Sequence, residues 1–238
     1  MPALSLLYQK RCVINDSISV VIPSVGEIMD NEDIYYSAVT ALTAMPIDLL
    51  VQLDDEGIDF TTINEYELFL RLFPGLTTHD TSLIFGDLDL SKFKLATNAQ
   101  NGNLILVDEE QNIIIDRSIY SQIATTLRKI HHLEKNCRKP ANEEAKKFML
   151  KRARDKMKRR KKQKEMSQLE SLIIAMVNTE QYKYDFKGTR ELSIYQFNES
   201  VRQVIKKVDY DNKMHGIYAG TISVKDLSQD DLNWLTNK

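Results

Sequence analysis

Residues 156–164 read KMKRRKKQK, so seven of these nine side chains are cations. The segment lies within residues 141–187, a stretch without proline or glycine. Because both helix-breaking residues are missing there, the stretch predicts one long helix. Cations on every side of two helical turns cannot pack in an apolar core. The segment must therefore face either water or an acidic surface.

The charge of the chain is divided unevenly. Residues 138–164 hold 14 Lys and Arg against 3 Asp and Glu, a local charge of +11, whereas the other residues sum to -13. An acidic chain with one basic arm indicates an acidic partner. That partner could be nucleic acid, another protein, or the acidic body of the chain itself.

Bulk composition indicates a soluble globular protein of one or two domains. The chain has 238 residues, of which 42% are hydrophobic and 28% charged. Its two cysteines, Cys12 and Cys137, lie far apart in the sequence, so we expect reduced thiols in a reducing compartment. The longest apolar run, residues 172–177, is too short for a membrane span, and residues 1–7 contain no basic leader. These patterns predict a cytosolic protein without a membrane segment.

The first part of the chain predicts a mixed domain. Residues 4–8 and 17–22 read as a hairpin around Asn15 and Asp16, and residues 93–97, 104–107 and 113–115 read as an antiparallel meander that the hairpin could extend. The turn between the first two meander strands contains Asn101-Gly102. Ser24 with Glu27, and Thr62 with Glu65, have capping-box spacing. The expected helices begin near residue 24 and cover 33–45, 46–57, 62–73 (ended by Pro74-Gly75) and 118–132.

The last part predicts helices only. After the basic segment the long helix resumes an apolar stripe, and Gly188 is expected to separate it from an amphipathic helix over 194–208. A short piece over 214–219 and a final helix over about 226–235 should follow. The predicted fold class is α+β, with a mixed domain (1–137), a long basic connector helix (138–178) and a helical C-terminal domain (179–238).

Motifs for catalysis are not found in the sequence. It contains no phosphate-binding glycine loop, no dinucleotide fingerprint and no nucleophile elbow. Its histidines, His79, His131, His132 and His215, do not have the spacing of a metal site. We therefore expect no catalytic residues, no metal and no cofactor, and hence no enzyme.

Several stretches resemble a known family. They are PSVGEI (23–28), IDF (58–60) with YELF (66–69), FGDLDLSKF (85–93), KPANEE (139–144), and IYQF (194–197) followed by MHGIY (214–218). Together they resemble tail assembly chaperones of long-tailed phages of Gram-positive bacteria. The resemblance implies a non-enzymatic protein that binds the tape measure protein and aids tail tube assembly in the cytoplasm of an infected host.

Two groups of residues are candidates for binding. The basic helix over 151–164 carries no aromatic side chain, which favours a protein partner over nucleic acid. Nucleic-acid binding and a minor structural role in the virion stay as alternatives, and the apolar stripes could instead form core. The electrostatic candidates are Lys151, Arg152, Arg154, Lys156, Lys158, Arg159, Arg160, Lys161, Lys162 and Lys164; the partner-binding candidates are Met166, Leu169, Ile173, Met176, Tyr195, Phe197, Tyr218 and Trp234.

Overall fold

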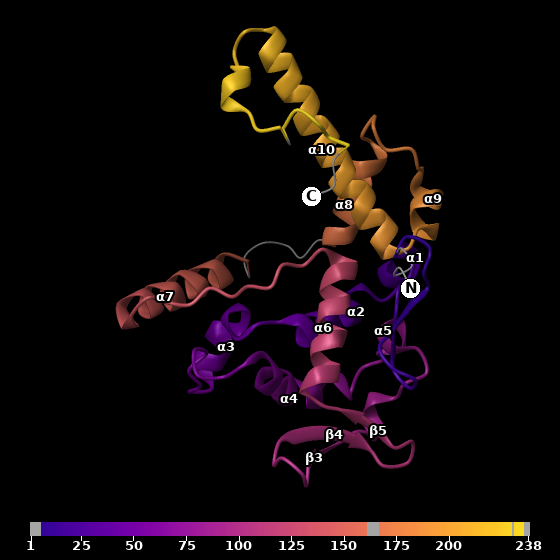
Figure 1. Cartoon of the computed structure of the whole chain (residues 1–238), viewed down its shortest axis with the longest axis vertical. Coiled ribbons are helices and arrows are strands. Elements are labelled where there is room, and N and C mark those ends of the chain that lie inside the picture. The colour runs from indigo at the N-terminus through magenta and orange to yellow at the C-terminus, as the bar shows by residue number, and fades with distance from the viewer. Residues whose placement is uncertain (1–5, 161–166, 230, 236–238) are drawn as a thin grey trace.

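The computed structural model describes residues 6–160, 167–229 and 231–235. Figure 1 shows a body of helices from which α7 and α10 project in different directions. Two small antiparallel sheets complete the body, so the predicted α+β class is confirmed. The helices are α1 (Val25–Met29), α2 (Glu32–Thr43), α3 (Leu50–Asp55), α4 (Glu65–Leu76), α5 (Ser82–Phe85), α6 (Arg117–His131), α7 (Glu143–Arg160), α8 (Gln168–Val177), α9 (Phe186–Glu191) and α10 (Ile194–Tyr218), with 3-10 helices η1 (Pro46–Leu49), η2 (Leu90–Lys92) and η3 (Val224–Asp226).

The two sheets are separate. The meander has the order β3-β4-β5, as predicted, and Gly102 takes a φ of 70° in its first turn. The hairpin β1-β2 does not extend it, because β2 packs against α5 and α6 instead. The first hairpin strand was expected over 4–8, where residues 4 and 5 lie outside the described residues and residues 6–8 form a turn. The strand instead covers Arg11–Val13, next to a tight turn in which the Asn15 side chain accepts hydrogen bonds from the amides of Ser17 and Ile18. The strands are β1 (Arg11–Val13), β2 (Ser19–Val21), β3 (Lys94–Thr97), β4 (Leu104–Asp108) and β5 (Ile113–Ile115).

The helix boundaries in the first part follow local capping chemistry. The capping box of Ser24 and Glu27 is confirmed at the start of α1. At α4 the prediction was wrong, because Asn64 is the cap and the hydroxyl of Thr62 donates to the Asp59 carbonyl instead. The helix also continues past Pro74, whose ring lies in the last turn. Proline there removes one main-chain donor, and burial of Leu76 keeps that turn on the core.

The predicted long helix is two helices. Ser167 has φ -50° and ψ 121°, which is not helical, and its hydroxyl accepts from the Glu170 amide to start α8. Gly188 does not separate the last part either. It lies inside α9, whose start is capped by the Asp185 side chain.

The last part differs from its prediction in length. Residues 194–208 and 214–219 were expected as two pieces, but the single 25-residue helix α10 runs through both and ends at Tyr218, with Ala219 as its C-cap. Beyond Gly220 the chain turns back, and Trp234 accepts a hydrogen bond through its carbonyl from the Gln203 side chain. Residues 231–235 form turns rather than the expected final helix. Hydrogen bonds from Gln203 and Lys213 of α10 hold this segment in place although it forms no helix.

The described residues form two apolar core clusters. The larger one surrounds α6 and includes side chains of α8 and α10 together with those of β2 and α1. The backbone joins these parts as well, since the Val25 amide donates to the Leu192 carbonyl and the Ile194 amide to the Pro23 carbonyl. The smaller cluster lies around η1, α3 and α4, and α7 packs on it. The basic helix α7 therefore packs on the smaller of the two clusters.

Candidate interaction surface on helix α7

Helix α7 is amphipathic, with one face against the body. The packed side chains recur every three to four residues, which places them on one side of the helix. They contact the smaller cluster, which includes Leu50, Leu53 and Phe60. The packed residues of α7 are Met149, Leu150, Ala153 and Met157.

Ion pairs border this apolar contact. Nη2 of Arg154 lies 2.6 Å from Oδ2 of Asp54 and 2.6 Å from Oδ1 of Asp55, both at the end of α3. Nearer the start of α7, Nζ of Lys146 lies 2.5 Å from Oδ2 of Asp59. The hydrogen bond from Lys146, with further bonds from Thr61, lowers the pKa of Asp59 to about 2. Two cations of the basic helix thus bind the acidic body of the chain.

The other face of α7 is exposed and strongly basic. Phe148 is 65% exposed there, although large aromatic side chains are usually covered. Asp155 is the acidic exception in the second half of the face. No hydrogen bond or ion pair of the exposed cations occurs among the residues that the structure describes. These exposed cations are Lys147, Lys151, Arg152, Lys156, Lys158 and Arg159.

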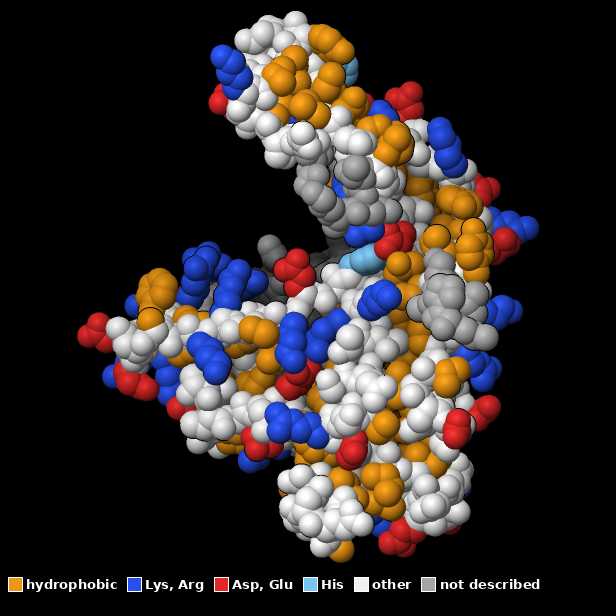
Figure 2. Space-filling model, viewed as in Figure 1, with side chains coloured by type: hydrophobic (Ala, Val, Ile, Leu, Met, Phe, Trp, Pro, Cys, Tyr) orange, Lys and Arg blue, Asp and Glu red, His pale blue; other side chains and the backbone are white. Residues whose placement is uncertain are grey.

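Figure 2 shows where this surface lies. The molecule is hollowed between α7 and the part that contains α10, and Lys and Arg side chains gather over α7 along the edge of the hollow. Like charges close together on a helix repel one another. An arrangement of this kind is stabilised when an anionic partner binds.

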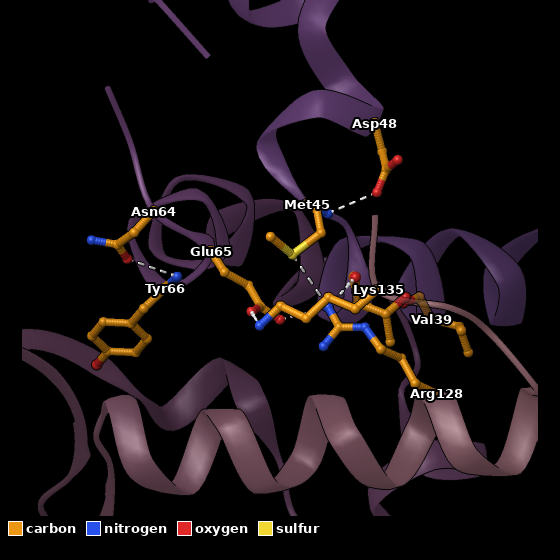
Figure 3. A network of polar contacts seen from close by, with 9 residues as sticks. Val39, Met45, Asp48, Asn64, Glu65, Tyr66, Arg128 and Lys135 are labelled. Atoms are coloured by element: carbon orange, nitrogen blue, oxygen red, sulfur yellow. Dashed lines mark hydrogen bonds and ion pairs between the residues drawn. The ribbon is translucent and has the colours of Figure 1, made fainter. Parts of the chain in front are cut away.

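A polar network, largely buried at Arg128 and Glu65, fixes the chain that leads into α7 (Figure 3). Nη2 of Arg128 on α6 lies 2.5 Å from Oε1 of Glu65 on α4, and also donates to the carbonyl of Thr43. Oε2 of Glu65 lies 2.5 Å from Nζ of Lys135, just beyond α6. Asn136 then donates to the Asp48 side chain. The connection to α7 is therefore anchored at Lys135 and Asn136.

The electrostatic candidates from the sequence are divided by the structure. Lys151, Arg152, Lys156, Lys158 and Arg159 lie on the exposed face. Arg154, expected to bind a partner, instead faces α3 because Asp54 and Asp55 hold it. Arg160 ends α7, and only its backbone is described. Lys161, Lys162 and Lys164 lie outside the described residues.

Sequence reasoning missed Lys147 and Phe148. Both precede the basic run, and neither was among the residues expected to bind a partner. The adjacent pair Met149 and Leu150 forms the packed stripe instead, and this sets the helix phase that turns Phe148 outward. A helical projection based on that pair would have found it.

The apolar candidates occupy different environments. Four of them are buried in the larger cluster, so they form core, which the sequence had left open as an alternative to partner binding. They are Leu169, Ile173, Met176 and Phe197. In contrast, Tyr218 is 80% exposed. Met166 lies outside the described residues, Tyr195 stacks on His132 with ring centroids 5.6 Å apart, and Trp234 lies near Lys207.

Neither a metal-binding cluster nor a membrane-spanning helix occurs in the described ranges. No group of three or more His, Cys, Asp or Glu side chains is placed there to hold a metal ion. No helix among the same residues has the length and apolar character needed to cross a membrane.

Comparison with protein families matches the C-terminal part of the chain. Residues 160–237 match the family model of the YomV second domain. This domain belongs to a phage-associated family. The matched region starts at the last residue of α7 and contains α8, α9, α10 and η3. No curated protein and no solved structure matches the chain.

Proposed function

We propose that this chain is a phage assembly factor that binds another protein and catalyses no reaction. The observation that carries the proposal is the exposed face of α7, where Phe148 lies among six cations that have no ion pair within the described ranges. An aromatic anchor surrounded by charged groups is the composition of many protein interfaces. Because Arg154 and Lys146 bind the body, the helix is already in place before a partner arrives.

The identity of the partner rests on similarity. The YomV second-domain match supports a phage origin. The resemblance of residues 23–28, 85–93 and 194–197 to tail assembly chaperones points to the tail. We therefore propose that the protein binds the tape measure protein and aids tail tube assembly in the cytoplasm of an infected bacterium.

Nucleic-acid binding is the second candidate function. The cations exposed along α7 favour it, because phosphate contacts by Lys and Arg supply most non-specific affinity. The residues 143–160 contain no Asn, Gln or Ser, the side chains that commonly read base edges beside Arg. This candidate would therefore bind the phosphate backbone without reading sequence.

Co-expression tests the first candidate. The chain is produced with the tape measure protein from the same tail gene cluster, and both co-purification and the soluble fraction of the tape measure protein are measured. The variant carrying Lys151→Glu and Arg152→Glu should lose co-purification, because two attractive contacts become repulsive. The matched control carries Lys10→Glu and Lys225→Glu, exposed cations outside α7 with the same change in charge.

The outcomes separate the candidates. Failure of the unmodified chain to co-purify contradicts the assembly role, and an equal loss in the control contradicts α7 as the binding surface. Titration with a DNA duplex at about 50 mM salt decides the alternative, since phosphate-driven binding is strong at low salt and falls steeply as salt rises. Saturable DNA binding that the Lys151→Glu and Arg152→Glu changes abolish would favour nucleic acid instead.

A further inference from the structure

The exposed face of α7 has an ordered charge pattern. At about 100° per residue, steps of four, three and four residues keep side chains within a band about 60° wide. Starting from Phe148, such steps trace one line down the centre of the face. Along it the character changes from apolar to positive, negative and positive. The line consists of Phe148, Arg152, Asp155 and Arg159.

We propose that this line binds an acidic amphipathic helix of the partner in one fixed register. The inference rests on the proposed function, in which the partner is a protein. Carboxylates of the partner helix face Arg152 and Arg159, which are two turns or about 10.5 Å apart. A cation between them faces Asp155, and an apolar side chain packs against Phe148. Lys151 and Lys158 on one side strengthen the preference for an acidic helix.

Asp155 argues against a phosphate backbone as the occupant. A nucleic-acid strand presents negative charge at every phosphate, so a carboxylate in the middle of the contact would be repelled. A protein helix can place a Lys or Arg opposite Asp155 and carboxylates one turn to either side. The alternation along the line therefore fits an occupant whose charge also alternates.

The support beneath α7 favours a defined register. On the packed face, Met149 and Met157 contact the smaller cluster, and Arg154 binds two carboxylates of α3. This contact fixes the rotation of α7 about its axis. The exposed line therefore presents one fixed arrangement, and binding orders few additional groups in this protein. The hollow beside α7 in Figure 2 leaves the basic edge accessible.

Designed peptides test the register with the full-length protein. The first peptide is a labelled helix of about 21 residues, long enough to span the face, with an apolar residue, Glu, Lys and Glu at steps of four, three and four. The second has the same composition, with the Lys and its preceding Glu exchanged. Fluorescence anisotropy should show about tenfold tighter binding of the first peptide, because the exchange turns two attractive pairs into repulsive ones.

The Asp155→Lys variant gives the decisive comparison. It should bind the first peptide about tenfold more weakly, and a peptide with Glu in place of its Lys should recover that loss. Asp155 is exposed, so the substitution should leave the fold intact. Equal binding of the first two peptides overturns the proposal, and so does tighter binding of the first peptide by Asp155→Lys. A DNA duplex bound more tightly by the unmodified chain than any peptide would identify phosphate as the ligand and also overturn it.

The peptide assay is independent of the tape measure experiment. If the tape measure protein co-purifies while the two peptides bind equally, the register is wrong and the assembly role stands. If the peptides are distinguished and the tape measure protein does not co-purify, the α7 site stands and its partner is a different acidic protein.

Discussion

Nη2 of Arg154 lies 2.6 Å from Oδ2 of Asp54, although the two residues are 100 positions apart in the chain. This ion pair joins the last turns of the basic helix to the end of α3. It lies at the edge of the apolar contact made by Met157 and its neighbours. The pair therefore selects which side of α7 faces the body and which side stays available for a partner.

We predict that Arg154→Ala loosens α7 without unfolding the chain. The pair is partly exposed, and such ion pairs contribute little to the free energy of unfolding. Local opening of α7 requires less free energy than global unfolding, so its amides should exchange faster. Hydrogen exchange followed by mass spectrometry measures this. Lys156→Ala, on the exposed face, should leave the exchange unchanged.

A result in which Arg154→Ala and Lys156→Ala exchange alike would mean that the apolar contact alone holds α7. In that case Met149→Ala and Met157→Ala would be the changes that release it.

In contrast to the Arg154 ion pair, the Arg128 network should contribute strongly to the free energy of unfolding. Glu65 is largely buried and is bound by both Arg128 and Lys135 (Figure 3). Arg128→Met leaves that carboxylate without its closest buried cation, so we expect a loss of about 3–5 kcal/mol in the free energy of unfolding. Urea denaturation measures it. Lys135→Met, at the exposed end of the network, should lower the free energy by less than about 1 kcal/mol.

Similar losses for Arg128→Met and Lys135→Met would show that the network acts as one exposed cluster. The double variant Arg128→Met with Glu65→Gln separates the two readings. Removing both charges should recover part of the loss if the buried carboxylate is its cause.

The α+β class, the meander and most helices could be predicted because their signals are local. The Ser24 and Glu27 capping box and the Asn101-Gly102 turn act over a few residues. Predictions were wrong where a neighbouring residue that can also cap a helix set the helix boundary. Asn64 replaced Thr62 as a cap, and Ser167 interrupted a helix that lacked any proline or glycine.

The candidate surface could be predicted only in part. The charge of α7 is visible in composition, and its exposed cations except Lys147 were identified. Which cations stay exposed depends on carboxylates about 100 positions earlier, as Arg154 and Asp54 show. The exposure of Phe148 likewise depends on the smaller cluster beneath α7. Such distant contacts leave no local pattern.

A half-buried histidine, His131, should make stability depend on pH. Nε2 of His131 lies 2.9 Å from the Tyr35 hydroxyl, and its ring packs against Tyr36. Burial, with a smaller contribution from the charge of His132, lowers the pKa of His131 from 6.5 to about 4. The unfolded state therefore takes up the proton first. Stabilisation is complete above about pH 6.5 and is lost as the pH falls toward 4.

His131→Gln tests this dependence, because glutamine keeps a group that can bond to Tyr35 but does not titrate. The free energy of unfolding of the unmodified chain should fall between pH 6.5 and 4 relative to that of His131→Gln. One proton limits the slope to about 1.4 kcal/mol per pH unit. His215→Gln, exposed on α10, should follow the unmodified chain. Parallel curves for all three proteins would exclude His131 as the titrating group.

The region matching the YomV second domain should not fold alone. Its buried side chains Leu169, Ile173 and Phe197 belong to the same cluster as Ile18 and Val25 of the first part. A fragment of residues 160–238 would expose that surface to water. The exposure costs a free energy of roughly 25 cal/mol per Å² of apolar area. We therefore expect the fragment to lack cooperative thermal unfolding by circular dichroism.

The full chain provides the matching measurement. Trp234 is its only tryptophan and reports on the C-terminal segment, whereas circular dichroism reports on all helices. Because the core is shared, both signals should change at one urea concentration. Phe197→Ala, which empties a fully buried site, should shift both midpoints downward together and lower the free energy of unfolding by about 3–5 kcal/mol. Tyr218→Ala, at an exposed site on the same helix, should shift neither. Two separate transitions would instead show that α8, α9 and α10 fold independently of the first part.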